Sequence, residues 1–137
     1  MKTIPLFLFL LFVLVNLKDC SAKKELNQAP MIETNEMNKP SRIRLKNASG
    51  SDFTNVRVVF PSQEENYGDL KKGQVSEYRT IQKAFGYAYI ELLISEEKFV
   101  LQPIDYSGEI PLGEGNFTYV LDANIKERAL DVTLIKD

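Results

Sequence analysis

The residues with the most evident chemical potential are two carboxylates, Asp105 and Glu109, in the segment PIDYSGE. Paired acids can share the work of proton donor and nucleophile, as they do in glycoside hydrolases. The same segment has the composition of a turn, in which Asp105 and Ser107 bond the local backbone, Gly108 takes a positive φ and Glu109 is solvated. The turn is the favoured interpretation, and a small carboxylate-dependent hydrolase is the alternative.

Other catalytic chemistries are limited by the residue types that the chain lacks. The sequence contains no histidine and a single cysteine, Cys20. Within the chain this excludes Ser-His-Asp and Cys-His nucleophilic sites and histidine-ligated zinc. Thiolate chemistry beyond Cys20 is excluded as well. We therefore expect no metal, no cofactor, no catalytic residue and no enzymatic activity.

A second group of candidate residues is Tyr87, Tyr89 and Glu91 in the apolar run FGYAYIELLI. Residues two apart share a face of a strand, so these three are expected to project together. The residues between and beyond them are expected to fill the core: Ala88, Ile90, Leu92 and Ile94. Neighbouring exposed tyrosines would offer amphipathic area to a protein or a sugar. The opposing interpretation is that cross-strand neighbours such as Tyr78 or Arg79 cover them as ordinary sheet pairs.

The N-terminus has the pattern of an export signal. Lys2 precedes the apolar run 4–17, which is shorter than the 20 or so residues of a membrane span. Two outcomes are open for this signal peptide, residues 1–22. Lipidation of Cys20 is favoured because the cysteine ends the apolar run, as in a lipobox, although Asp19 is atypical before it. The alternative is cleavage after Ala22, at small residues. The protein is expected in the periplasm or on the outer membrane as a lipoprotein, or secreted.

The remainder of the chain divides into a linker and a domain. Residues 23–40 show no apolar periodicity and carry balanced charges, so they are expected to form a flexible tether that spans about 25 Å. Residues 41–137 have the length of one compact domain that needs no disulfide.

Charge limits the class of partner. The chain has 17 basic and 19 acidic residues, a net charge of −2 and no basic run, which argues against nucleic acid. The expected partner is an envelope protein or glycan, with membrane contact through the lipid if Cys20 is modified.

Alternating apolar residues predict strands in SRIRLK, NVRVVF, VSEYRTI and ALDVTLI, whereas PSQEEN is expected to be a loop. The residues aligned on core faces are Ile43 and Leu45; Val56, Val58 and Phe60; and Leu130, Val132 and Leu134. About eight strands and no helix predict an all-β fold, an antiparallel β-sandwich with Ig-like or transthyretin-like topology. A small barrel is the alternative.

Three segments resemble a group of small, uncharacterised exported proteins of Bacteroidota: IRLKNASGSDFTNVRVVF, YGDLKKGQVSEY and PIDYSGEIPLGEGNFTYVLD. The resemblance covers most of residues 42–122. It implies a bacterial envelope protein built as a β-sandwich, and it names no catalytic residue. We therefore expect a non-enzymatic, exported or lipid-anchored envelope module that binds or assembles with a partner.

Overall fold

The computed structural model describes residues 38–137, and eight strands account for most of them. The strands are β1 Ser41–Asn47, β2 Phe53–Val59, β3 Glu64–Leu70, β4 Arg79–Ile81, β5 Tyr89–Ile94, β6 Glu97–Leu101, β7 Gly115–Asn124 and β8 Ala129–Lys136. The predicted all-β fold is confirmed, with no helix among the described residues. Cys20, the predicted signal peptide and most of the predicted tether lie outside this range.

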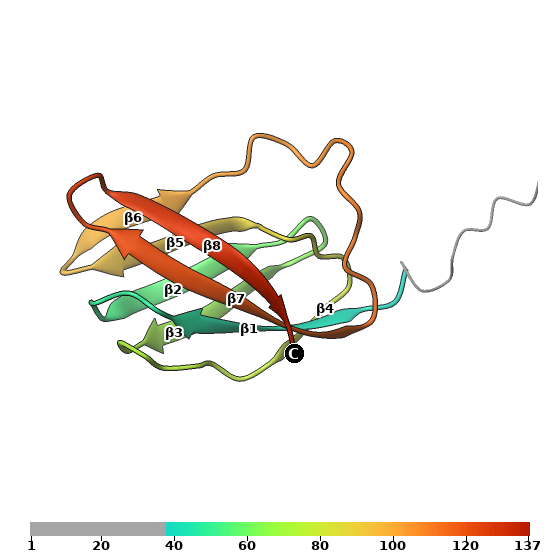
Figure 1. Cartoon of the computed structure of the whole chain (residues 1–137), viewed down its shortest axis with the longest axis horizontal. Coiled ribbons are helices and arrows are strands. Elements are labelled where there is room, and N and C mark those ends of the chain that lie inside the picture. The colour runs from blue at the N-terminus through green and yellow to red at the C-terminus, as the bar shows by residue number, and fades with distance from the viewer. Residues whose placement is uncertain (1–37) are drawn as a thin grey trace, which may run out of the picture. The chain divides into compact units, whose positions relative to one another are not determined.

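The strands form two four-stranded sheets, ordered β4-β1-β7-β8 and β3-β2-β5-β6, which lie over one another (Figure 1). They form a β-sandwich, and the barrel alternative is wrong. An immunoglobulin sandwich would place its first two strands in one sheet, whereas β1 and β2 lie in different sheets here. Of the two expected topologies, this order leaves the transthyretin-like one.

One strand pair departs from the expected antiparallel arrangement. β1 runs parallel to β7, with Ser41 opposite Gly115 and Asn47 opposite Leu121. Parallel neighbours need a long crossover, and here the whole of the second sheet lies between β1 and β7 in the sequence. The pairing therefore ties the start of the domain to its C-terminal hairpin.

The core lies between the sheets and is built from the residues that the alternation predicted. Ala88, Ile90, Leu92 and Ile94 are all 5 % exposed or less, so the inward face of FGYAYIELLI is confirmed. The predicted core residues of the other strands are buried or pack against the buried cluster: Ile43, Leu45, Val56, Val58, Phe60, Leu130, Val132 and Leu134. Removing each large aliphatic side chain from water contributes about 1.5–3 kcal/mol.

The prediction of a loop over PSQEEN is wrong in its second half, because β3 begins at Glu64. β3 is an edge strand with β2 as its partner, so polar side chains can point to solvent along it. Glu64 also pairs with Arg57 of β2 at 3.0 Å. This ion pair between β2 and β3 helps to stabilise a polar segment as a strand of the sheet.

The prediction of a strand over VSEYRTI is also wrong in part, because β4 is limited to Arg79–Ile81. Upstream, Val75 forms a single bridge with Lys46. The backbone N–H of Ser76 donates to the Leu45 carbonyl at 2.8 Å, while the hydroxyl of Ser76 accepts from the Leu45 N–H at 2.9 Å. The Ser76 hydroxyl thus takes the place of a backbone carbonyl as the acceptor for Leu45. This substitution interrupts the regular strand pairing before β4.

The connection 102–114 joins β6 of one sheet to β7 of the other and arches over one end of the sandwich (Figure 1). Its second half is tied to the domain. The N–H of Leu112 donates to the Ala84 carbonyl at 2.9 Å, and the Ser41 hydroxyl donates to the Gly113 carbonyl. Lys39 pairs with Glu114 at 2.9 Å. These contacts hold the connection in place over the end of the core.

Candidate functional site

A groove of about 420 Å³ lies where three segments distant in the sequence meet. Its lining comes from the end of β2, the start of β5 and the first part of the connection: Val59, Phe60, Pro61, Tyr89, Gln102, Pro103, Ile104, Asp105 and Tyr106. Most of these side chains are apolar or aromatic. The groove therefore offers apolar walls with the polar groups of Gln102 and Asp105 and the hydroxyls of Tyr89 and Tyr106.

One wall of the groove rests on the core. Phe60 is 3 % exposed, and its ring lies 6.1 Å from that of Tyr119. Tyr119 is fully buried, and its hydroxyl donates to the Phe85 carbonyl. Burial raises the pKa of Tyr119, so the hydroxyl stays a donor at any physiological pH. The Phe60 wall of the groove is therefore held in place by the core before any ligand binds.

Tyr106 attaches the connection to the segment before β5. Its ring stacks on Phe85 at 4.8 Å and on Tyr87 at 5.5 Å between centroids. Such aromatic pairs contribute about 0.5–1.5 kcal/mol each beyond their buried area. No local pattern predicts this role, because Tyr106 lies in the segment interpreted only as a turn.

Tyr87 meets both candidate acids. Its hydroxyl lies 3.0 Å from the Asp105 carbonyl oxygen and 3.3 Å from Oε1 of Glu109, and it donates to one of them at a time. Partial burial, and then the charge of Glu109, raise the pKa of Tyr87. Tyr87, Tyr89 and Glu91 were expected to share one face of a strand. β5 begins at Tyr89, so the prediction is wrong for Tyr87, which precedes the strand.

Tyr89 borders the groove and is half-buried. Its hydroxyl donates to Oε2 of Glu91 at 2.9 Å, and the guanidinium of Arg57 lies over its ring at 5.7 Å. Tyr89 is therefore covered by a residue of a neighbouring strand, as the sheet-pair interpretation expected. The covering residue is Arg57, and not Tyr78 or Arg79. Tyr78 lies under Arg42 and Arg44, and Arg79 lies over Tyr67.

Glu91 is held by three neighbours. Besides Tyr89, it pairs with Lys98 of β6 at 3.1 Å and with Arg57 of β2 at 3.4 Å. The hydrogen bonds from Lys98 and then Tyr89 lower the pKa of Glu91 below its ordinary range. Its charge is thus compensated within the sheet.

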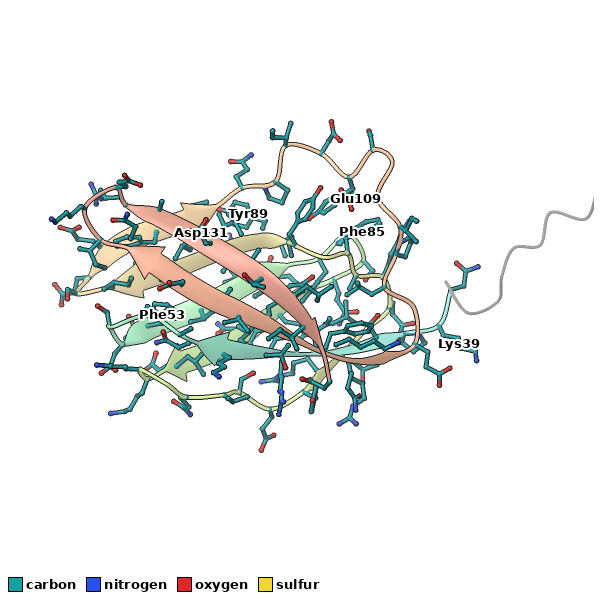
Figure 2. All side chains as sticks on the ribbon, in the orientation of Figure 1. Lys39, Phe53, Phe85, Tyr89, Glu109 and Asp131 are labelled. Carbon is teal, nitrogen blue, oxygen red and sulfur yellow. The ribbon has the colours of Figure 1, made fainter. Side chains whose placement is uncertain are left out.

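Asp105 and Glu109 occupy the turn that their segment predicts. Oδ1 of Asp105 accepts from the Ser107 N–H at 2.8 Å, the N–H of Glu109 donates to the Tyr106 carbonyl at 3.1 Å, and Gly108 has φ +79°. Both acids are exposed, and only Asp105 lines the groove. Figure 2 shows Glu109 on the connection that arches over the domain, with Phe85 nearby.

The same connection exposes two large aliphatic side chains. Ile104 is 100 % exposed and Ile110 is 71 % exposed. Other exposed aliphatics in residues 38–137 stand singly on different elements: Val75, Ile125 and Ile135. Ile104 also lines the groove, and exposed apolar surface at a groove is typical of an interaction site.

The described residues hold neither a candidate metal site nor a candidate membrane-spanning helix. No group of three or more histidine, cysteine or acidic side chains in residues 38–137 could hold a metal ion. In the same range, no helix is long and apolar enough to cross a membrane.

Comparison with known proteins finds similarity among solved structures alone. No family model and no curated protein matches the chain. A protein from Eubacterium rectale, determined by NMR, is similar to it with a TM-score of 0.49 and 15 % identity, over 72 % of this chain and 88 % of that one. A similarity at this level says nothing about function, and the fold assignment here rests on the strand order.

Proposed function

We propose that this protein is a non-enzymatic module of the bacterial cell envelope that binds a partner through the end of its sandwich. The observation that carries the proposal is the connection 102–114, which lines a groove of about 420 Å³, exposes Ile104 at that groove and exposes Ile110 farther along the same segment. A rigid sandwich that presents a fixed loop is well suited to recognition. Of the three residues of the predicted face, Tyr89 borders this surface. Tyr87 contacts Asp105 and Tyr106 of the connection. Glu91 forms ion pairs within the sheet.

The alternative function is hydrolysis by Asp105 and Glu109. A general acid needs a carboxyl group whose pKa is raised by an enclosed, apolar setting. Both side chains are solvent-exposed, and Asp105 is engaged with the backbone of its own turn. Binding is favoured over hydrolysis on this ground.

The binding surface is tested by capture from the source envelope with the full chain as bait. The variant Ile104→Ser with Ile110→Ser should reduce recovery of the specific partner about tenfold or more, because interface anchors contribute about 1–2 kcal/mol each. The matched control, Ile125→Ser with Ile135→Ser, removes two equally apolar, exposed side chains from other elements. It should capture as the natural chain does. Equal recovery by both double variants, with unchanged melting temperatures, would contradict the proposal.

The proposed cellular location is the periplasm or the outer membrane, with Cys20 as the lipid attachment site. Cys20→Ala should move the protein out of the membrane fraction or block its processing, since the lipid would be the anchor. Ser21→Ala, next to it, should fractionate as the natural protein does. If Cys20→Ala and the natural chain are equally soluble and equally processed, cleavage after Ala22 becomes the better account.

A further inference from the structure

The connection 102–114 carries an uncompensated negative charge. It contains Asp105, Glu109 and Glu114 and neither lysine nor arginine. Glu114 pairs with Lys39, whereas Asp105 and Glu109 form no ion pair with any residue of the described range, 38–137. Glu91, on the neighbouring sheet face, shows the contrast, because Lys98 and Arg57 both pair with it.

Asp105 lines the groove, and Glu109 lies near it through a shared neighbour, the Tyr87 hydroxyl. The Tyr87 hydroxyl is within reach of the Asp105 carbonyl and of the Glu109 carboxylate, so both residues surround one hydroxyl. Lys83 is the basic side chain with a contact in this cluster, and it lies over the Phe85 ring at 5.7 Å without an ion pair to either acid. The site therefore favours a ligand that brings a positive charge.

The groove itself favours an apolar side chain. Pro61 and Pro103 have no N–H to offer, and the rings of Phe60, Tyr89 and Tyr106 supply the rest of the wall. Aromatic and proline surfaces of this kind receive aliphatic or proline side chains of extended peptides. Ile104, fully exposed at the edge, gains cover only when a ligand lies across it.

Other occupants fit these features less well. A sugar needs several free hydrogen-bonding groups, whereas in this lining Oδ1 of Asp105 already accepts from Ser107 and the Tyr89 hydroxyl already donates to Glu91. An anionic membrane surface would be repelled by Asp105 and Glu109. A peptide that combines apolar and basic side chains matches both the walls and the charge.

We infer that the groove receives a peptide segment of a partner protein, with an aliphatic or proline residue between Tyr89 and Pro103 and a lysine or arginine beside Asp105 and Glu109. This inference rests on the proposed binding function and names the class of partner. The apolar residue supplies the anchor, and the basic residue selects the partner and speeds the encounter.

The test uses a displayed library of random 12-residue peptides, selected on the immobilised full chain after depletion on Ile104→Ser with Ile110→Ser. Selected peptides should carry lysine or arginine within a few residues of an aliphatic or proline residue. The strongest, made synthetically, should bind about tenfold more weakly to Asp105→Asn with Glu109→Gln. Both substitutions keep the acceptors that Ser107 and Tyr87 use, so the charge alone is removed. Glu96→Gln with Glu127→Gln, two exposed acids on other turns, is the control and should bind as the natural chain does.

The outcomes separate the inference from the proposed function. Peptides that require Ile104 and Ile110 but lack basic residues, and that bind Asp105→Asn with Glu109→Gln normally, overturn the charge inference and leave a binding groove. Failure to select any peptide that depends on Ile104 and Ile110 overturns the inference, while partner capture from the envelope still decides the function. Binding of chitohexaose or of phosphatidylglycerol vesicles at the groove overturns it too. Self-association of the chain that Ile104→Ser with Ile110→Ser abolishes overturns the inference as well, because a second copy would then be the occupant.

Discussion

At the scale of single residues, carboxylates on neighbouring segments have opposite surroundings. Glu91 is surrounded by Lys98, Tyr89 and Arg57, while Asp105 and Glu109 meet a hydroxyl and a backbone N–H. The first arrangement stabilises a folded sheet, and the second leaves charge available to a ligand. Removing the charge of Glu91, by acid or by substitution, should therefore lower the stability of the fold. Removing the charges of Asp105 and Glu109 should instead weaken ligand binding.

Glu91→Gln should reduce stability at pH 7 and matter less in acid. The pKa of Glu91 is lowered in the folded state, so its ionised form stabilises the fold above its ordinary value of about 4.3. This contribution is lost as the pH falls through the lowered, folded-state pKa. Urea unfolding of the natural chain and of Glu91→Gln should show a difference at pH 7 that shrinks near pH 3.

The control for this titration is Glu127→Gln. Glu127 is exposed on the β7–β8 turn and forms no ion pair within residues 38–137, so its replacement should change stability little. A Glu91→Gln difference of the same size at both pH values would mean that the charge of Glu91 does not stabilise the sheet.

At the scale of elements, the β5–β6 hairpin stores backbone strain. Ile94 pairs with Glu97, so Ser95 and Glu96 form a two-residue turn, with φ of 50° and 67°. Tight turns of this kind need positive φ at both positions, where glycine and asparagine are favoured. A glutamate in the left-handed region costs about 1–2 kcal/mol relative to glycine's freedom there.

Glu96→Gly should stabilise the domain by about 0.5–1 kcal/mol, because relief of the positive φ exceeds the entropy that glycine adds to the unfolded chain. Denaturant unfolding measures the effect. Lys126→Gly is the matched control, since Lys126 lies in the β7–β8 turn and is not among the residues with positive φ. It should lower stability slightly. A loss of stability in Glu96→Gly would show that the turn relaxes without strain in solution.

The elements also show what sequence reasoning reached and where it stopped. The alternation of apolar residues predicted the inward faces of β1, β2, β5 and β8, because one face of each strand is removed from water. It missed the start of β3 and the interruption before β4. There, edge pairing and a serine hydroxyl, rather than burial, decide the backbone.

The groove could not be read from local pattern. It forms where residues 59–61, Tyr89 and residues 102–106 meet, and this meeting depends on sheet order. The turn at Asp105 and Gly108 was predictable because its hydrogen bonds are local. The stacking of Tyr106 on Phe85 and Tyr87 joins segments about 20 positions apart and leaves no local signal.

At the scale of the whole domain, the sandwich brings the features of the proposed binding surface to one end. The connection crosses between the sheets there, and Lys39, near the start of the described chain, pairs with Glu114 of that connection (Figures 1 and 2). The start of the described chain, where the predicted tether would join the domain, therefore lies beside the connection. If Cys20 anchors the tether, a partner at the groove would be met close to the attachment point.

The most direct measurement of where the protein binds is site-specific photo-crosslinking in the source cells. p-Benzoylphenylalanine is incorporated in the full chain in place of Ile104, or, as a matched control, in place of Ile125 or Ile135, which are exposed on other elements. A surface centred on the connection predicts a discrete protein adduct from position 104 and none from positions 125 and 135. Adducts from position 125 or 135, with none from position 104, would contradict the account.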